Sequence, residues 1–320
     1  MSQNTRQPIG DRSREDLEEL FEAADYVADE QLVTTAYLAL RLDRPLLIEG
    51  PPGSGKTELA KVLASGLETE LVRLQCYEGL TAENALYEWN YTKQLLSVQS
   101  GSAVGSGLDD TPRSDRGGET SPSVFDEEYL LERPLLTALR ADRRPVLLID
   151  EIDRADEEFE AFLLELLSDF QVSIPELGTI EADAAPIVVL TSNRTRALGD
   201  ALKRRCLYLH VEPPSFEEEY EIVRRKVPEL DAAVAAAVCG VVERLREESF
   251  LKQPGVAETL DWARAVSTLR IEETDEPISP EEIEQTLGCL LKEVEDIDRV
   301  DTELLEQLRE AAAAATERVE

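Results

Sequence analysis

Histidine, cysteine and lysine are scarce in this sequence. The only histidine, His210, alternates with Leu209 and Val211 in a predicted strand, and we interpret it as an ordinary surface or core residue. The four cysteines stand alone, without the spacing of metal ligands or redox pairs: Cys76, Cys206, Cys239 and Cys289. Neither a zinc site nor a disulfide scaffold is therefore expected.

Long apolar runs are also missing. The longest stretch of small apolar residues, 232–242, is far shorter than the roughly 20 residues that a membrane-spanning helix needs. The N-terminus is polar and charged, without the apolar segment of a signal peptide. We therefore expect a soluble, cytoplasmic protein with no membrane partner.

Positive charge is the third deficit. The chain has 33 Lys and Arg against 68 Asp and Glu, a formal net charge of −35, and only seven of the basic residues are lysine. Residues 214–320 carry −16 of that charge and residues 1–213 carry −19, so the excess of acid is spread along the whole chain and is not confined to a tail. Such a field repels nucleic acid. A highly saline cytoplasm would explain it, because salt screens the self-repulsion; an ordinary acidic protein is the alternative.

What is present suffices for a globular fold. Hydrophobic residues make up 42% of the 320 residues, enough for one large domain or for a core and a smaller second domain. Five short apolar segments predict buried strands: 45–49, 71–75, 145–151, 187–191 and 207–211. Helical patterns separate them, and every segment beyond Pro213-Pro214 is helical in pattern. This order predicts an α/β fold, a three-layer αβα core with a parallel sheet over 1–213, followed by a small all-helical domain over 214–320.

Within the first domain, apolar spacing predicts several further elements. Helices are expected over 16–26, 31–42, 58–67, 129–141 and 156–170, and Pro134 could delay the start of the fourth. A hairpin is expected over 171–180. Tyr87, Trp89 and Tyr91 have the period of a strand, and we favour a packing role over a substrate contact. Residues 97–123, with seven Ser and five Gly, predict a mobile insertion.

The strongest functional signal follows the first strand, as a phosphate-binding loop. It comprises Gly50, Pro51, Pro52, Gly53, Ser54, Gly55, Lys56 and Thr57. Glycines let backbone N–H groups turn toward an anion, the lysine reaches the β- and γ-phosphates, and the hydroxyl holds Mg²⁺. A helical pattern begins directly afterwards, so that its positive end faces the phosphates. We predict that the loop binds ATP with Mg²⁺.

Two acids end the third predicted strand. Asp150 can support the Mg²⁺ ion, and Glu151 can polarise a water for attack on the γ-phosphate. Apolar strands that end in acids are common, so this pattern gains its meaning from the loop that precedes it.

Polar residues after the fourth predicted strand complete the candidate site. Asn193 follows that strand and could orient the attacking water; a plain turn residue is the alternative. In the basic triplet 203–205, Arg204 or Arg205 could reach a γ-phosphate on a neighbouring subunit. These arginines could equally complement the dipole at a helix end.

From about residue 20 to 270 the sequence resembles AAA+ ATPases of the MoxR type. The resemblance rests on the Walker A segment 50–57, the Walker B segment 146–151, Thr191-Ser192-Asn193, and the segments 201–206 and 254–262. Longer stretches resemble the CoxD-like subgroup that accompanies carbon monoxide dehydrogenase: 74–80, 86–91, 150–159 and 169–177.

This resemblance implies a P-loop NTPase of the AAA+ fold with a helical lid, assembled as a homo-oligomeric ring, usually a hexamer. It also implies a von Willebrand factor A-domain partner and a chaperone-like role in maturing a metalloenzyme or complex. By position, Asn193 would be sensor 1 and Arg205 the arginine finger, with Arg204 close behind. The position of a sensor 2 arginine is occupied by Ala257, for which Lys252 or Arg264 could substitute.

Two other functions remain open from the residues. One is a nucleotide-dependent assembly switch that hardly hydrolyses ATP. The other is a DNA-associated AAA+ motor, against which stand the −35 charge and the lack of a basic, aromatic-interleaved segment.

Overall fold

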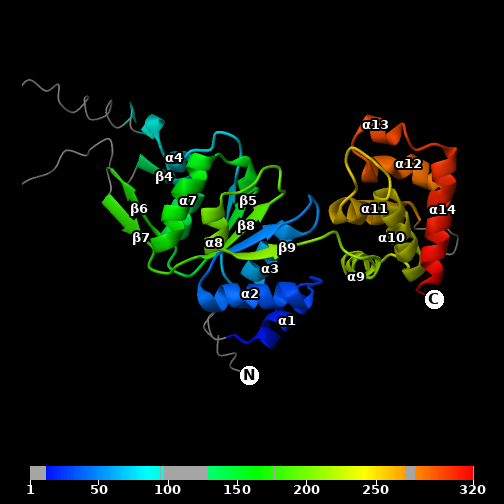
Figure 1. The fold of residues 1–320 in the computed structure, drawn as a ribbon, viewed down its shortest axis with the longest axis horizontal. Coiled ribbons are helices and arrows are strands. Elements are labelled where there is room, and N and C mark those ends of the chain that lie inside the picture. The colour runs from blue at the N-terminus through cyan, green and yellow to red at the C-terminus, as the bar shows by residue number, and fades with distance from the viewer. Residues whose placement is uncertain (1–11, 94, 97–128, 176–177, 271–277, 320) are drawn as a thin grey trace, which may run out of the picture.

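The centre of the molecule is a sheet of five parallel strands in the order β2-β5-β8-β1-β9 (Figure 1). The computed structural model describes residues 12–93, 95–96, 129–175, 178–270 and 278–319. The strands are β1 (Leu46–Glu49), β2 (Leu71–Gln75), β5 (Val146–Asp150), β8 (Ile187–Ser192) and β9 (Leu207–His210). All five lie where the apolar segments predicted them. The three central strands are buried at every position, as in a parallel sheet that is covered on both faces.

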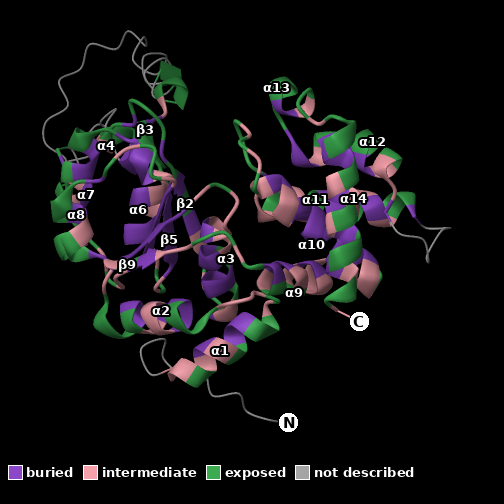
Figure 2. Ribbon diagram, turned by 45° about the vertical axis from the view of Figure 1, so that its right-hand side comes forward, coloured by how far each residue is buried: buried purple, intermediate pink, exposed green. Residues whose placement is uncertain are grey.

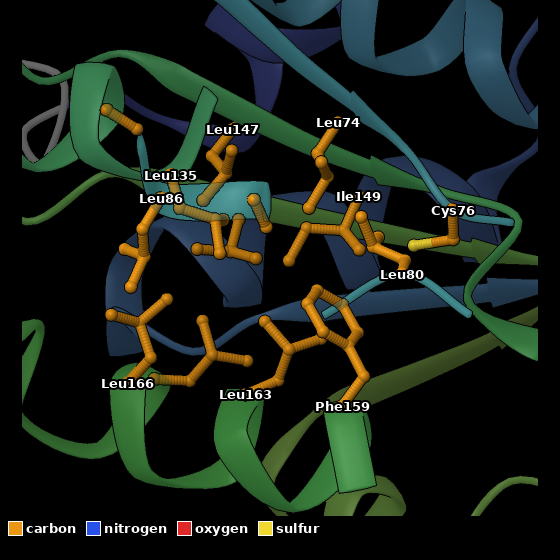
Figure 3. Close-up of a cluster of buried hydrophobic side chains, with 14 of the residues drawn as sticks. Leu74, Cys76, Leu80, Leu86, Leu135, Leu147, Ile149, Phe159, Leu163 and Leu166 are labelled. Atoms are coloured by element: carbon orange, nitrogen blue, oxygen red, sulfur yellow. The ribbon is translucent and has the colours of Figure 1, made fainter. Parts of the chain in front are cut away.

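Helices cover both faces of this sheet (Figures 1 and 2). One layer consists of α1 (Arg14–Ala23), α2 (Glu30–Leu42) and α3 (Lys56–Gly66). The other consists of α4 (Ala82–Leu86), α6 (Pro134–Leu139), α7 (Glu157–Asp169) and α8 (Asp200–Arg205). Successive strand residues point to opposite faces, so Leu148 packs in the first layer and Leu147 and Ile149 in the second, near Phe159 and Leu163 of α7 (Figure 3). The predicted three-layer α/β core is confirmed.

The predicted helix over 156–170 is α7. It begins after Asp156, whose carboxylate accepts a hydrogen bond from the N–H of Phe159 at 2.9 Å, and it ends at Phe170 in the left-handed conformation with φ 47°. The chain then forms the predicted hairpin from β6 (Gln171–Ile174) and β7 (Gly178–Glu181), which pair antiparallel.

The helix expected over 129–141 begins only at Pro134, the later start that this proline allowed, and the residues before it form a strand that was not predicted. Residues Leu130–Glu132 form β4, which pairs antiparallel with β3 (Tyr87–Trp89), and the helix begins only at Pro134. Proline fits the first turn of a helix and keeps the preceding residue, Arg133, extended (φ −106°, ψ 168°). The side chains of Tyr87 and Trp89 are buried with ring centroids 5.9 Å apart, which is the packing role that their spacing predicted, whereas Tyr91 is exposed.

Beyond β9 the described chain is helical and has a hydrophobic core of its own (Figure 1). Its helices are α9 (Phe216–Lys226), α10 (Ala232–Arg246), α11 (Val256–Leu269), α12 (Pro280–Leu290), α13 (Val294–Ile297) and α14 (Thr302–Glu317). Trp262 lies at the centre of this core, and its indole N–H donates to Thr286 Oγ1 at 2.7 Å. The helices after the core fold are therefore confirmed.

The insertion predicted over 97–123 lies outside the described residues. Among the helices that are described, none is long and apolar enough to cross a bilayer.

Candidate functional site

The loop between β1 and α3 has the conformation that its glycines permit. Gly53 and Gly55 have φ of 78° and 82°, in the left-handed region. A Cβ on Gly50 would lie 2.2 Å from the carbonyl oxygen of Val211, so only glycine fits there. The loop therefore lies against the end of β9 and turns directly into the N-terminus of α3, as a phosphate-binding loop requires.

Lys56 is the first residue of α3 and is buried beneath this loop. Its Nζ donates to the carbonyl oxygens of Gly50 at 2.9 Å and Pro51 at 2.6 Å. Burial lowers the pKa of the Lys56 ammonium, against the opposing charges of nearby acids, of which Asp153 has the largest effect. The side chain of Lys56 thus lies along the inside of the loop, and its ammonium is close enough to contact an anion bound by the loop.

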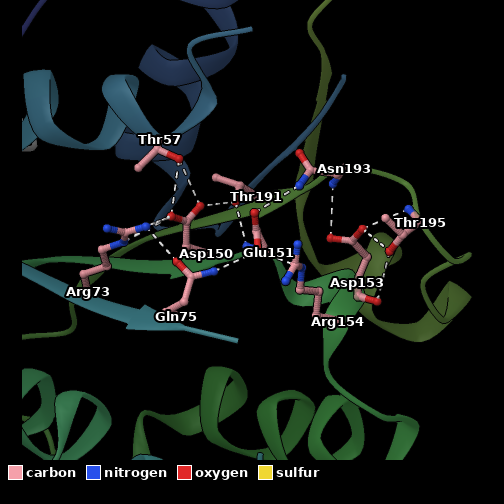
Figure 4. A network of polar contacts seen from close by, with 10 residues as sticks. All are labelled: Thr57, Arg73, Gln75, Asp150, Glu151, Asp153, Arg154, Thr191, Asn193 and Thr195. Atoms are coloured by element: carbon pink, nitrogen blue, oxygen red, sulfur yellow. Dashed lines mark hydrogen bonds and ion pairs between the residues drawn. The ribbon is translucent and has the colours of Figure 1, made fainter. Parts of the chain in front are cut away.

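Asp150, at the end of β5, is the most highly coordinated carboxylate of the site (Figure 4). Its Oδ1 accepts hydrogen bonds from Thr57 Oγ1 at 3.0 Å and Thr191 Oγ1 at 2.5 Å. Its Oδ2 accepts hydrogen bonds from Nε and Nη2 of Arg73, at 3.1 and 2.6 Å. The parallel register of β2, β5 and β8 brings these residues together at the carboxyl edge of the sheet.

Glu151 leaves the strand in the left-handed conformation, with φ 56°. Its backbone N–H donates to Thr191 Oγ1 at 2.9 Å, and its carboxylate is held on both oxygens. Oε1 accepts from Asn193 Nδ2 at 3.2 Å, whereas Oε2 accepts from Gln75 Nε2 at 3.0 Å and pairs with Arg154 Nε at 2.8 Å (Figure 4). The structure thus brings the predicted Asn193 to the predicted water-activating acid.

Asp153, in the short 3₁₀ helix η3 (Ile152–Arg154), fixes the loop that carries Asn193. Its carboxylate accepts the backbone N–H groups of Asn193 at 3.1 Å and Thr195 at 2.9 Å, and the Thr195 hydroxyl at 2.6 Å. Burial acts to raise the pKa of Asp153, but the hydrogen bonds from Thr195 and Asn193 outweigh it and the pKa is lowered.

Sequence reasoning missed Arg73, Gln75, Asp153 and Thr195 as members of this site. The available signal was the alternation in β2, where Val72 and Leu74 are buried on one face and two long polar side chains share the other. Asp153 stands only three residues after Asp150, which marks it as a member of the same turn.

The site opens into a cleft of about 1210 Å³ between the sheet edge and the C-terminal helices. Its lining includes Lys56, Thr57, Asp150, Glu151 and Asn193 from the core and Lys226, Ala257 and Arg264 from the helices. His210, which we interpreted as an ordinary surface or core residue, is also among the lining residues. Lys252 is not among the residues that line this cleft, and its backbone N–H donates to Asp296 at 3.0 Å.

The model of the AAA domain (dynein-related subfamily) matches residues 45–206, just over half of the chain. The chain belongs to this AAA family. An uncharacterized protein of Staphylococcus haemolyticus, SH1500, is 25% identical over 250 residues, covering 76% of this chain and 82% of its own. The Holliday junction branch migration complex subunit RuvB of Thermotoga petrophila is 23% identical over 272 residues, 83% of this chain and 65% of RuvB.

Among solved structures, a mutant of Thermotoga maritima RuvB aligns over 86% of this chain and 83% of its own, with 17% identity and a TM-score of 0.40. In the sequence comparison, by contrast, this AAA protein covers about two thirds of the length of the Thermotoga petrophila RuvB.

Two predicted residues of the AAA domain lie away from the cleft. Arg204 and Arg205 end α8, where Arg44 donates to their backbone carbonyls at 2.6 and 3.0 Å. The guanidinium of Arg205 donates to the carbonyl oxygen of Leu164 and to Ser168 Oγ on α7. The structure does not bring them to the phosphate loop of their own chain, and a contact with a neighbouring subunit stays a prediction.

Proposed function

We propose that this AAA protein binds ATP with Mg²⁺ and hydrolyses it to ADP and phosphate. The observation that carries the proposal is the position of Glu151. Its carboxylate is held by Asn193 at 3.2 Å, one residue after the Asp150 that accepts the Thr57 hydroxyl at 3.0 Å. A base for water and a pair of metal-binding oxygens thus meet beside the phosphate loop.

The residues fit an Mg²⁺ ion of the kind that nucleotides bring with them. Mg²⁺ is commonly bound through one or two protein oxygens while phosphates and waters complete its shell, and Thr57 and Asp150 offer such oxygens. Bound there, the ion would neutralise charge on the phosphates. Lys56 would contact the same phosphates, and the N–H groups of the loop would orient them.

In the reaction, Glu151 would accept a proton from the attacking water and Asn193 would keep that carboxylate oriented. Gln75 and Arg154 contact Oε2 and would help to hold the carboxylate in place. Arg264 faces the cleft from α11 and is our candidate for the lid residue that reads the γ-phosphate in place of Ala257.

At a finer level, we propose a MoxR-type remodeller that matures a metalloenzyme or protein complex. The long CoxD-like segments support this, and with it a hexameric ring, a von Willebrand factor A-domain partner and Arg205, or Arg204, acting across the subunit boundary. The exposed end of α8, stabilised by Arg44, is compatible with such a contact.

Two alternative functions predict different experimental results. An assembly switch would bind ATP with little turnover, which measurement of phosphate release in concentrated KCl distinguishes. A DNA-associated role is suggested by the name of the RuvB relative, but the net charge of −35 opposes phosphate binding outside the cleft. Salt-titrated DNA binding tests it.

The variant Glu151→Gln tests the proposal. It should retain ATP binding and lose phosphate release by about 100-fold or more, because the amide cannot accept the proton of the water. The matched control is Glu158→Gln, an exposed acid in the first turn of α7, which should hydrolyse at the wild-type rate. Retained turnover in Glu151→Gln would refute the assignment.

The same variant tests the finer proposal. Held in the ATP state, it should elute as a ring-sized assembly and retain its client in a pull-down. A protein that stays monomeric with ATP would remove the ring and the role of Arg205, but not the ATPase.

A further inference from the structure

Arg73 has no place in the predicted phosphate site, yet it makes the closest charged contact to the metal-binding carboxylate. It lies on the edge strand β2, two residues before Gln75, which pairs in register with Asp150. The alternation of β2 turns Val72 and Leu74 into the core and sends Arg73 and Gln75 to the opposite face.

The guanidinium is fixed at three points. Nε and Nη2 both donate to Oδ2 of Asp150, at 3.1 and 2.6 Å, and Nη2 also donates to Gln75 Oε1 at 2.7 Å (Figure 4). The two partners differ in burial: the side chain of Asp150 is 3% exposed, whereas that of Arg73 is 51% exposed. If these hydrogen bonds break, the half-exposed arginine can turn into solvent, whereas the carboxylate of Asp150 is buried at the end of β5.

This pairing balances the charge of a buried acid. A buried carboxylate without a compensating charge is costly, and the hydroxyls of Thr57 and Thr191 on Oδ1 bring dipoles but no charge. Arg73 supplies the charge on Oδ2. A cation already bound to this carboxylate weakens its attraction for a second one.

We propose that Arg73 is a displaceable counter-ion of Asp150 that competes with Mg²⁺ and so sets the metal affinity of the nucleotide complex. This inference rests on the proposed nucleotide site. Arg73 acts as a positioning residue: it holds the carboxylate ready, and loading of the metal requires the guanidinium to leave Oδ2 or to share it.

The test compares Arg73→Gln with wild type by Mn²⁺ binding, followed by electron paramagnetic resonance in the presence of ADP. Mn²⁺ serves as the probe for Mg²⁺. Removal of the competing charge should tighten Mn²⁺ binding by about tenfold. Arg73→Lys, which restores a cation, should return the affinity toward the wild-type value. Arg309→Gln, which removes a charge from an exposed ion pair on α14, should leave it unchanged.

A second measurement needs no nucleotide. In EDTA, Arg73→Gln should unfold at a lower temperature than Arg309→Gln, because Asp150 loses its partner. A purely structural role would lower both stability and metal affinity, whereas the proposal requires them to change in opposite directions.

The outcomes are distinct. Unchanged or weaker Mn²⁺ binding by Arg73→Gln, with ADP still bound, overturns the counter-ion role and leaves the nucleotide site standing. A loss of ADP binding in EDTA would instead make Arg73 a phosphate contact and also overturn it. Wild-type protein that binds neither ADP nor ATP would remove the proposed function itself.

Discussion

Asp153 shows how a carboxylate close to Asp150 and Glu151 can stabilise the backbone of a neighbouring loop. Its carboxylate accepts hydrogen bonds from the loop after β8: from the N–H of Asn193, and from the N–H and hydroxyl of Thr195. The acid is buried at 3% exposure. Its charge therefore stabilises the loop that presents Asn193 to Glu151.

This role predicts a pH-dependent loss of stability in Asp153→Asn. The pKa of Asp153 is lowered in the folded protein, so its stabilising effect is complete above the unfolded pKa of about 3.9 and is lost as the pH falls through the lower folded value. At neutral pH the variant should be less stable by about 1–3 kcal/mol, because the NH₂ group of asparagine cannot accept the hydrogen bonds that one carboxylate oxygen of Asp153 accepts. Urea unfolding at a series of pH values measures the difference.

The control for this series is Asp156→Asn, which changes a helix cap one turn away. The gap between wild type and Asp153→Asn should narrow toward acid pH. A gap of the same size at every pH would show that the charge of Asp153 is not what stabilises the loop.

Sequence reasoning found the site residues that belong to a recognisable motif and missed Arg73 and Gln75, which join the site through the order of the strands. The loop 50–57 and the acids at 150 and 151 each form a local pattern. The contact of Arg73 with Asp150 exists only because β2 lies next to β5, although 77 positions separate the two residues. No local pattern carries that information.

Among the elements, α10 and α14 approach closely at Gly240. A Cβ on Gly240 would lie 2.5 Å from the Cβ of Ala315 and 2.7 Å from the carbonyl oxygen of Ala311. The alanine run 311–315 of α14 and the small residues of α10 thus allow the two helices to approach, and they bury Ala312 and Ala315 in the helical core.

Gly240→Ala should therefore destabilise the helical part although alanine is the better helix former. The added methyl group meets backbone on α14, and overpacking of this kind costs about 1–3 kcal/mol. The control is Gly288→Ala on α12, where a Cβ meets nothing within 4 Å and the substitution should stabilise by up to about 1 kcal/mol. Denaturant midpoints compare them, and equal gains in both variants would contradict the close packing.

Element boundaries were predictable where one face of the element faces the core. The stripe of α7 gave its position almost to the residue. In the segment 129–141, Pro134 indicated where the helix begins, but β4 was not predicted, because Leu130, Leu131 and the leucines after Pro134 share a helical spacing. Pairing of β4 with β3, a contact across more than 40 positions, decides the conformation before the proline.

For the whole molecule, the acidic charge extends across both the αβα core and the C-terminal helices, which face each other across the cleft. Even if every basic residue paired with one acid, the 33 basic residues would leave 35 of the 68 acidic residues without a basic partner. The remaining carboxylates repel one another within each part and between the parts. In dilute buffer, where the screening length is about 10 Å, this repulsion opposes the compact state.

The melting temperature should therefore rise steeply with salt. Between about 0.1 M and about 2 M KCl the screening length falls below about 3 Å, and relief of a few kcal/mol of repulsion would raise Tm by roughly 5–10 °C. Calorimetric or circular dichroism melts in a KCl series measure this. Sucrose at matched osmolarity and low salt is the control, because it favours compact states without screening charge. If Tm is the same at both salt concentrations, or rises equally with sucrose, the acidic surface is not an adaptation to a saline cytoplasm.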